Sequence, residues 1–270
     1  MTAPILAFDI ETIPDVEALR RHYGISSQVN DDEAVEMVMR ILRQEKNTNF
    51  LPLPYHQVAV ISGVLRRFDS RDEAVKIFSL APPEYDEAGA VEMFYKIISK
   101  YTPRLASWNG GGFDLPVLHY RAMKHGVQAG RYWNAHGADS SGDKFRWNNY
   151  FNRYHERHLD LMDTLGMYQP RAWTGLEDMA QLCGLPGKIG VGGAGVWAAW
   201  QRGDTEAVRH YCEADALLTY LLFVRFQYFR GEWDDTATEE KLIRDYLLAE
   251  PLRWQEFLAQ WPAADFDLAT

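Results

Sequence analysis

Apolar and β-branched residues dominate the beginning of the chain. Residues 4–13 form a mostly apolar run ended by Pro14, and this pattern predicts a buried strand. Similar apolar runs at 57–67 and 75–80 predict two more strands. Together the three runs predict an antiparallel meander.

Strands and helices alternate after this meander. Apolar residues recur at helical spacing over 87–101, a short strand is predicted at 104–108, and a helix is predicted at 115–125. A long helical pattern follows at 204–230, with Asp204 as its N-cap. This combination predicts an α/β fold in which a central mixed β-sheet is flanked by helices.

Two regions interrupt the pattern. Residues 15–50 predict two helices inserted between the first two strands, whereas residues 126–157 have no clean period and predict an irregular excursion rich in basic and aromatic residues. No internal repeat or low-complexity tract divides the chain. We therefore interpret residues 1–232 as one domain and residues 233–270 as a C-terminal helical extension.

The composition argues against several classes of protein. The formal net charge of −10 argues against a protein that coats nucleic acid non-specifically, because Lys and Arg supply most of that affinity. The N-terminal segment lacks the basic start of a signal peptide, and no apolar run reaches the roughly 18 residues of a membrane span. The two cysteines are too few for a disulfide framework. We expect a cytoplasmic protein with no membrane association.

Two carboxylates on the first predicted strand are the first candidates for chemistry. Asp9 and Glu11 are two residues apart, so both side chains should lie on the same face of the strand. Burying such a pair is unfavourable unless cations offset the charge, and Mg²⁺ and Mn²⁺ prefer oxygen ligands. The structural alternative is that both acids lie at the exposed end of the strand, as helix caps or ion-pair partners.

Three further residues have structural alternatives when each is taken singly. Asp114 follows a strand and the glycine turn 110–112, where the sites of α/β proteins gather, but it could equally cap the next helix. Tyr211 and Asp215 are four residues apart on the long helix and share a face. A buried pair of this kind is more often structural than catalytic.

The order of these residues along the chain adds information. In chain order the motifs are Asp9-Ile-Glu11, Asn109-x-x-x-Phe113-Asp114 and Tyr211-x-x-x-Asp215. They resemble the three exonuclease motifs of the DEDDy family. The sequence is similar, over about residues 5–222, to the proofreading exonuclease domains of family B DNA polymerases and to the stand-alone predicted exonucleases related to them.

The resemblance implies a ribonuclease H-like fold and a 3′ to 5′ exonuclease that hydrolyses phosphodiesters with two metal ions. Asp9, Glu11, Asp114 and Asp215 would hold two Mg²⁺ or Mn²⁺ ions, and Tyr211 would orient or help deprotonate the attacking water. We expect the 3′ end of single-stranded DNA as the substrate. The alternatives are an RNA exonuclease of the same chemistry and a non-catalytic nucleic-acid-binding module on the same fold.

Five residues are candidates for contacts with nucleic acid, namely Asn109, Phe113, Arg146, Trp147 and Lys188. Asn109 and Phe113 match the second family motif and would position the terminal nucleotide. Basic and aromatic residues alternate over 121–158, as expected of a surface for unpaired strands, although a loop packed by its own aromatics is the alternative. By the same resemblance, a DNA polymerase or a repair protein would be the protein partner.

Two local patterns predict helix starts. His158, Asp160 and Asp163 could form a separate metal site, but this spacing is more typical of a strand end followed by a helix cap. Thr174 and Glu177 have the spacing of a capping box, which predicts that a helix begins there.

Overall fold

The computed structural model describes residues 3–69, 74–139, 142, 144–187 and 189–261. In this part of the chain, five strands form one sheet in the order β3-β2-β1-β4-β5. The strands are β1 (Ile5–Pro14), β2 (His56–Arg66), β3 (Val75–Leu80), β4 (Arg104–Ser107) and β5 (His158–Asp160). The first three strands pair antiparallel, while β1 with β4 and β4 with β5 pair parallel, which confirms the predicted meander and mixed sheet.

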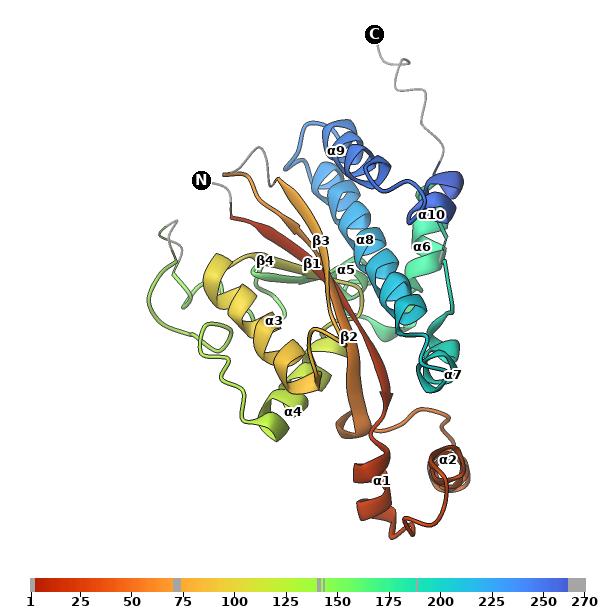
Figure 1. The fold of residues 1–270 in the computed structure, drawn as a ribbon. Coiled ribbons are helices and arrows are strands. Elements are labelled where there is room, and N and C mark those ends of the chain that lie inside the picture. The colour runs from red at the N-terminus through yellow and green to blue at the C-terminus, as the bar shows by residue number, and fades with distance from the viewer. Residues whose placement is uncertain (1–2, 70–73, 140–141, 143, 188, 262–270) are drawn as a thin grey trace.

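Helices cover both faces of the sheet (Figure 1). The α-helices are α1 (Val16–Tyr23), α2 (Asp31–Lys46), α3 (Glu87–Tyr101), α4 (Asp114–His125), α5 (Leu161–Leu165), α6 (Leu176–Leu182), α7 (Val196–Gln201), α8 (Thr205–Phe229), α9 (Ala237–Leu248) and α10 (Gln255–Gln260). Three short 3-10 helices are η1 (Leu53–Tyr55), η2 (Pro170–Ala172) and η3 (Gly193–Gly195). Helices α3 and α4 lie on one face, and α8 lies on the other (Figure 1). No helix of the described residues is long and apolar enough to cross a membrane.

The side chains of β1 alternate between two apolar cores. Leu6, Phe8 and Ile10 pack with apolar residues of α3 and α4. Ile5 and Ala7 point the other way and pack with α8. Because both faces of β1 are covered, the strand has the near-continuous apolar pattern seen in the sequence.

Strand β4 is much shorter than β1. Its pairing with β1 ends at Ala7, whereas β1 continues to Pro14. The edge of β1 beyond Ala7 is therefore available to the turn that follows β4. On its other edge, β1 pairs with β2 throughout, with an irregularity in register between Glu11 and Thr12 that is typical of a β-bulge.

The two helices predicted within residues 15–50 are α1 and α2. They pack on each other through a small core of their own, which consists of Leu19, Val38, Leu42 and Leu51. Asp32 at the start of α2 accepts hydrogen bonds from Trp197 Nε1 at 3.0 Å and from the Gln201 side chain. The helix pair is thereby attached to α7 at one end of the sheet (Figure 1).

The excursion at 126–157 is irregular, as predicted, and carries an isolated bridge between Ala138 and Lys144. Its Tyr132, Phe145 and Tyr150 side chains are buried and pack in the same core as α3 and α4. These three aromatic side chains therefore belong to the core of the fold and are not available to stack on unpaired bases. Trp147 and Tyr154, in contrast, are 69% exposed.

The predicted capping box at Thr174 is wrong. Helix α6 begins at Leu176 with Gly175 as its N-cap and with no side-chain hydrogen bond to the cap. The carbonyl oxygen of Thr174 instead accepts a hydrogen bond from Trp108 Nε1 at 3.1 Å. This contact links the connection between η2 and α6 to Trp108, which follows β4.

Helices α9 and α10 pack against the rest of the chain through apolar side chains. Ile243, Leu247 and Phe257 belong to the same buried core as α8 and the odd-numbered side of β1. Two buried acids on α9 pair with arginines, Glu239 with Arg66 at 2.7 Å and Glu240 with Arg225 at 2.8 Å. Residues 237–261 are thus attached to the sheet and to α8 by both apolar and ionic contacts.

Candidate active site

Three of the predicted carboxylates meet between β1 and α8. One ligand atom from each of Asp9, Glu11 and Asp215 lies within 4.8 Å of the other two. Asp9 and Glu11 lie on the odd-numbered side of β1, which faces α8, and Asp215 projects from that helix. Glu11 and Asp215 are buried, and Asp9 is partly exposed. A cluster of three carboxylate groups with one open side is suited to a hard divalent cation.

The fourth carboxylate, Asp114, lies at the N-terminus of α4. Its Oδ1 accepts a hydrogen bond at 3.2 Å from the backbone N–H of Ile10, the residue between Asp9 and Glu11. This bond is available because β4 ends before it reaches this part of β1. The N-cap of α4 is Phe113 rather than Asp114, so the carboxylate does not have the simple capping role that was the structural alternative.

Burial and neighbouring charges make Asp114 unusually basic for an aspartate. Burial is the largest effect that raises the pKa of Asp114 to about 7, and repulsion from the carboxylates of Asp160 and Asp215 adds to it. Asp114 lies outside the group of atoms within 4.8 Å of one another. Asp9, Glu11 and Asp215 therefore lie close together, whereas Asp114 is bound to the backbone of Ile10. The charge of Asp215 still raises the pKa of Asp114.

Tyr211 precedes Asp215 by one turn of α8, as predicted. It is 1% exposed and packs in a small core with Ile13 and Val60. The backbone at Gly190, which has φ +86°, passes close to Tyr211, and a Cβ at Gly190 would lie 3.5 Å from Tyr211 Cβ. The tyrosine is therefore fixed between the end of β1, β2 and the glycine-rich connection before α7.

Asn109 and Phe113 both belong to the turn between β4 and α4. Asn109 adopts a left-handed conformation with φ 64°. The Phe113 ring packs edge-on against His56 at 5.1 Å and against Phe50 at 5.7 Å between ring centroids. Glycine is required at residue 110, because a Cβ there would lie 2.3 Å from Ser107 Oγ and 2.5 Å from Ser107 Cβ. A Cβ at Gly112 would lie 2.4 Å from Asn109 Oδ1 and would force that side chain to move.

Asp160 has a role in this turn that the sequence pattern did not reveal. As predicted, it ends β5 and caps α5 by accepting a hydrogen bond from Asp163 N–H at 3.2 Å. Its carboxylate also accepts hydrogen bonds from the backbone N–H groups of Asn109 at 3.0 Å and Gly111 at 2.8 Å. Asp160 therefore fixes the turn that leads into Asp114.

Cys212 is a second neighbour of the site that motif analysis missed. Its Sγ lies 3.4 Å from the backbone oxygen of Asp9 and 3.5 Å from Asp9 Oδ2, so the thiol donates to this residue. Burial, followed by the charges of Asp9 and Glu11, raises the pKa of Cys212 well above its ordinary value. The spacing of three residues between Cys212 and Asp215 on one helix could have indicated this position.

Arg146 and Trp147 lie in the excursion at 126–157. The Arg146 guanidinium stacks over the Trp147 ring at 4.9 Å from its centroid, and Lys144 lines the same shallow pocket as Arg146. Among the described residues, the contacts of these two side chains do not reach the four carboxylates. Lys188, the remaining candidate for substrate contact, lies outside the described residues.

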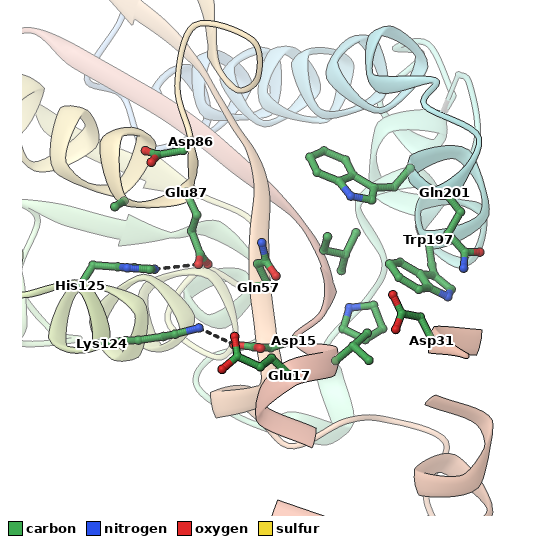
Figure 2. A pocket seen from close by; sticks show the side chains of 15 residues that line it. Asp15, Glu17, Asp31, Gln57, Asp86, Glu87, Lys124, His125, Trp197 and Gln201 are labelled. Carbon is green, nitrogen blue, oxygen red and sulfur yellow. Dashed lines mark hydrogen bonds and ion pairs between the residues drawn. The ribbon is translucent and has the colours of Figure 1, made fainter. Parts of the chain in front are cut away.

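An open pocket of about 840 Å³ lies where β1 ends, and it is bordered by α1, α2, α3, α4 and α7 (Figure 2). Ile13, which lines it, is two residues beyond Glu11 on the same side of β1. Figure 2 shows Lys124 directed at Asp15 and His125 directed at Glu87, with nitrogen to oxygen distances of 2.6 and 2.7 Å. The four carboxylates of the candidate site are not among its described lining residues.

The mixed sheet with helices on both faces is an α/β fold consistent with the ribonuclease H-like fold, and the carboxylates of β1 and α8 form an acidic cluster in it. Residues 48–261 match the model of a family described as "Predicted 3'-5' exonuclease related to the exonuclease domain of PolB", and the chain belongs to this family. The match contains Asp114, Tyr211 and Asp215 and begins after Asp9 and Glu11. The two acids of β1 are therefore connected to the site by their position in the structure.

A family B DNA polymerase from the hyperthermophilic archaeon Pyrobaculum calidifontis is a similar solved structure, with a TM-score of 0.48 and 16% sequence identity. The similarity covers 82% of this chain and 24% of the polymerase chain. The chain thus corresponds to about a quarter of the length of that polymerase. No curated protein matches the chain.

Proposed function

We propose that the chain is a metal-dependent exonuclease that removes nucleotides from the 3′ end of single-stranded DNA. The observation that carries the proposal is the approach of Asp9, Glu11 and Asp215 to within 4.8 Å of one another, from a strand and a helix that are far apart in the sequence. Three acids placed so closely repel one another unless a cation lies between them. Membership of the exonuclease family supports the same chemistry.

The donor set fits hard divalent cations. Asp9, Glu11 and Asp215 would hold one Mg²⁺ or Mn²⁺ ion, and Asp114 would help to hold a second ion together with Asp9. When bound, two such ions supply Lewis acidity at the scissile phosphate and lower the pKa of a water molecule. A nearby cation would also lower the pKa of Asp114 from its value of about 7, so that this group ionises when it becomes a ligand.

The remaining site residues would act on the water and on the terminal nucleotide. Tyr211 lies one helical turn from Asp215 and would orient the attacking water with its hydroxyl group. Asn109 and Phe113 would position the terminal nucleotide, by hydrogen bonding and by stacking respectively. Arg146 and Trp147 would contact nucleotides farther from the scissile bond. They are suited to this contact because the Trp147 ring is exposed and the Arg146 guanidinium lies over it.

The choice of DNA as the substrate and the choice of a protein partner both follow from the family. DNA is proposed because the family is related to the exonuclease domain of a DNA polymerase, and a DNA polymerase or a repair protein would be the partner on the same ground. An RNA substrate would need contacts with the 2′-hydroxyl group. A non-catalytic binding module has little support, because clustered negative charge near phosphate would weaken binding.

The test uses DNA and RNA oligonucleotides of one sequence, labelled at either end and incubated with and without Mg²⁺ or Mn²⁺. We expect nucleotides to be released from the 3′ end of DNA only when metal is present. Asp215→Asn should abolish release, while Glu206→Gln, an exposed acid on the same helix, should not change the rate. Equal rates for Asp215→Asn and the unmodified chain would refute the metal site. Faster release of nucleotides from RNA than from DNA would show that RNA is the substrate.

A further inference from the structure

Four aromatic and apolar side chains of residues 154 and 167–173 reach the surface; three of them are exposed and Tyr168 is half-buried. Tyr154, Met167 and Trp173 are 69%, 73% and 41% exposed. The Tyr154 ring packs edge-on against Tyr168, with ring centroids 4.9 Å apart. We call these four residues the aromatic strip. Exposed apolar side chains gathered in this way are typical of a surface that binds a partner.

Cationic side chains accompany the aromatic strip. The Arg153 guanidinium lies 5.9 Å from the Tyr154 centroid and 5.1 Å from the Tyr168 centroid, and it also pairs with Asp163. Arg171 is exposed on η2, two residues before Trp173. In a chain with a net charge of −10, this local combination of arginine and aromatic rings favours an anionic partner with flat, stackable groups.

Hydrogen bonds and an ion pair link the aromatic strip to the turn that carries Asn109. Asp160 accepts the backbone hydrogen bonds of Asn109 and Gly111 and also caps the short helix α5, on which Asp163 holds Arg153. On the other side, Trp108 donates a hydrogen bond to the carbonyl of Thr174, next to Trp173. Two separate contacts therefore connect the aromatic strip to the turn between β4 and α4.

The backbone of the aromatic strip is strained at two consecutive residues. Met167 and Tyr168 are consecutive non-glycine residues with φ values of 51° and 60°. Such conformations are costly and persist where the surroundings impose them, often at binding sites. Here the Tyr168 N–H donates to Asp163 O at 2.8 Å and the Met167 N–H donates to Thr164 O at 3.1 Å, which closes the turn after α5.

We infer that the aromatic strip binds the nucleotides that precede the 3′-terminal nucleotide, with bases on Tyr154, Tyr168 and Trp173 and phosphates near Arg153 and Arg171. The inference rests on the proposed exonuclease function and adds the path of the single strand to it. It places the nucleotides nearest the end on segments 153–154 and 167–173, whereas Arg146 and Trp147 would contact nucleotides farther away.

The test measures kcat and KM for oligonucleotides of increasing length, from a dinucleotide to a dodecanucleotide. For the unmodified chain, KM should fall as the added nucleotides reach the aromatic strip. Tyr154→Ala combined with Trp173→Ala should raise KM for the long substrates by tenfold or more, because each lost stacking contact contributes about one to two orders of magnitude in affinity. The dinucleotide places only one nucleotide on the aromatic strip, so its KM should rise less than that of the long substrates, and kcat should not change for either substrate.

Phe229→Ala is the matched control, because Phe229 is 77% exposed at the far end of α8. The inference is overturned if the double variant and the control show the same dependence of KM on length. It is also overturned if the double variant lowers kcat for the dinucleotide and for the long substrates alike, since the residues would then support the fold of the site. Absence of hydrolysis for every oligonucleotide with the unmodified chain would instead refute the proposed exonuclease function.

Discussion

Arg121 joins three elements through a buried network beside the pocket in Figure 2. Its guanidinium donates to both oxygens of Glu87 at 2.6 and 2.5 Å and to Asp15 Oδ2 at 2.6 Å. Glu87 also accepts the backbone N–H of Val58 at 2.7 Å, and Asp15 accepts that of Ala18 at 3.0 Å as the N-cap of α1. The network therefore fixes the starts of α1, α3 and β2. We predict that Arg121→Met destabilises the fold strongly.

The structure sets the size of this effect. Arg121 is 1% exposed, and the side chains of Asp15 and Glu87 are 4% and 8% exposed, so the substitution leaves two buried carboxylates without their main cation. Breaking a buried pair from one side costs about 3–5 kcal/mol. Lys124 and His125 still reach these carboxylates, which places the expected loss near the lower figure, about 3 kcal/mol. A domain with a total stability of about 5–15 kcal/mol would lose a large share of it.

Acid sensitivity provides an independent readout of the same network. Burial alone would raise the pKa of Asp15, but hydrogen bonds from Lys124 and Arg121 outweigh it and lower the pKa to about 2. A carboxyl whose pKa is lowered by folding stabilises the native state above its ordinary pKa of 3.8, and this contribution is lost as the pH falls from 3.8 to about 2. In Arg121→Met this loss should be smaller, because less of the stabilisation is present at neutral pH.

The assay is urea unfolding followed by circular dichroism, at pH 7 and between pH 5 and 2.5. Arg121→Met should lower the free energy of unfolding by about 3 kcal/mol at pH 7, and adding Asp15→Asn and Glu87→Gln should restore much of it, because no buried charge is then left uncompensated. Arg21→Met, which breaks an exposed pair with Glu17, should change it by less than about 0.5 kcal/mol. A loss below about 1 kcal/mol for Arg121→Met, or no recovery in the triple variant, would show that the Arg121 network does not hold these elements together.

Three other predictions concern the site and its supports. Burial, followed by the charge of His119, lowers the pKa of His158 to about 4, so His158 should contribute a stability loss of about 3 kcal/mol as the pH drops from 6.5 to 4. In unfolding experiments at the two pH values, His158→Asn should remove this part of the dependence, while the part due to His119, whose pKa burial also lowers to about 4, remains. Tyr211→Phe should reduce kcat roughly 10²-fold without eliminating activity, and an unchanged pH–rate profile would exclude the hydroxyl group from the reaction. Gly110→Ala should cost about 1–3 kcal/mol of stability in thermal unfolding and lower activity as well, because the added Cβ would lie 2.3 Å from Ser107 Oγ; full activity at unchanged stability would contradict the geometry of the turn.

The mixed sheet and the meeting of three carboxylates could be predicted from the sequence. The two-residue period of β1 places Asp9 and Glu11 on one face of the strand. The four-residue spacing places Tyr211 and Asp215 on one face of α8. Each spacing concerns one element only. The expectation that the acids of β1 and α8 meet came from the order of the motifs along the chain and their resemblance to the exonuclease family. The close approach of Asp9, Glu11 and Asp215 agrees with that interpretation.

Contacts between distant segments were beyond the reach of local patterns. The hydrogen bond from Ile10 to Asp114 joins residues 104 positions apart and exists only because β4 is short. The hydrogen bond from the Asn109 N–H to Asp160 likewise joins distant residues, and it forms because β5 pairs with the end of β4. The capping box at Thr174 failed because α6 begins one residue later than the spacing predicts, with Gly175 as its N-cap.

The alternation of β1 between two cores also constrains how this strand can evolve. Deleting or inserting a single residue before Asp9 would turn both acids toward the apolar side chains of α3 and α4, and would expose Phe8 and Ile10 where a cation should bind. Exchanges among similar apolar residues leave that orientation intact. Homologous chains should therefore vary freely in side-chain identity along this strand while keeping its length fixed from the first apolar position to the acids.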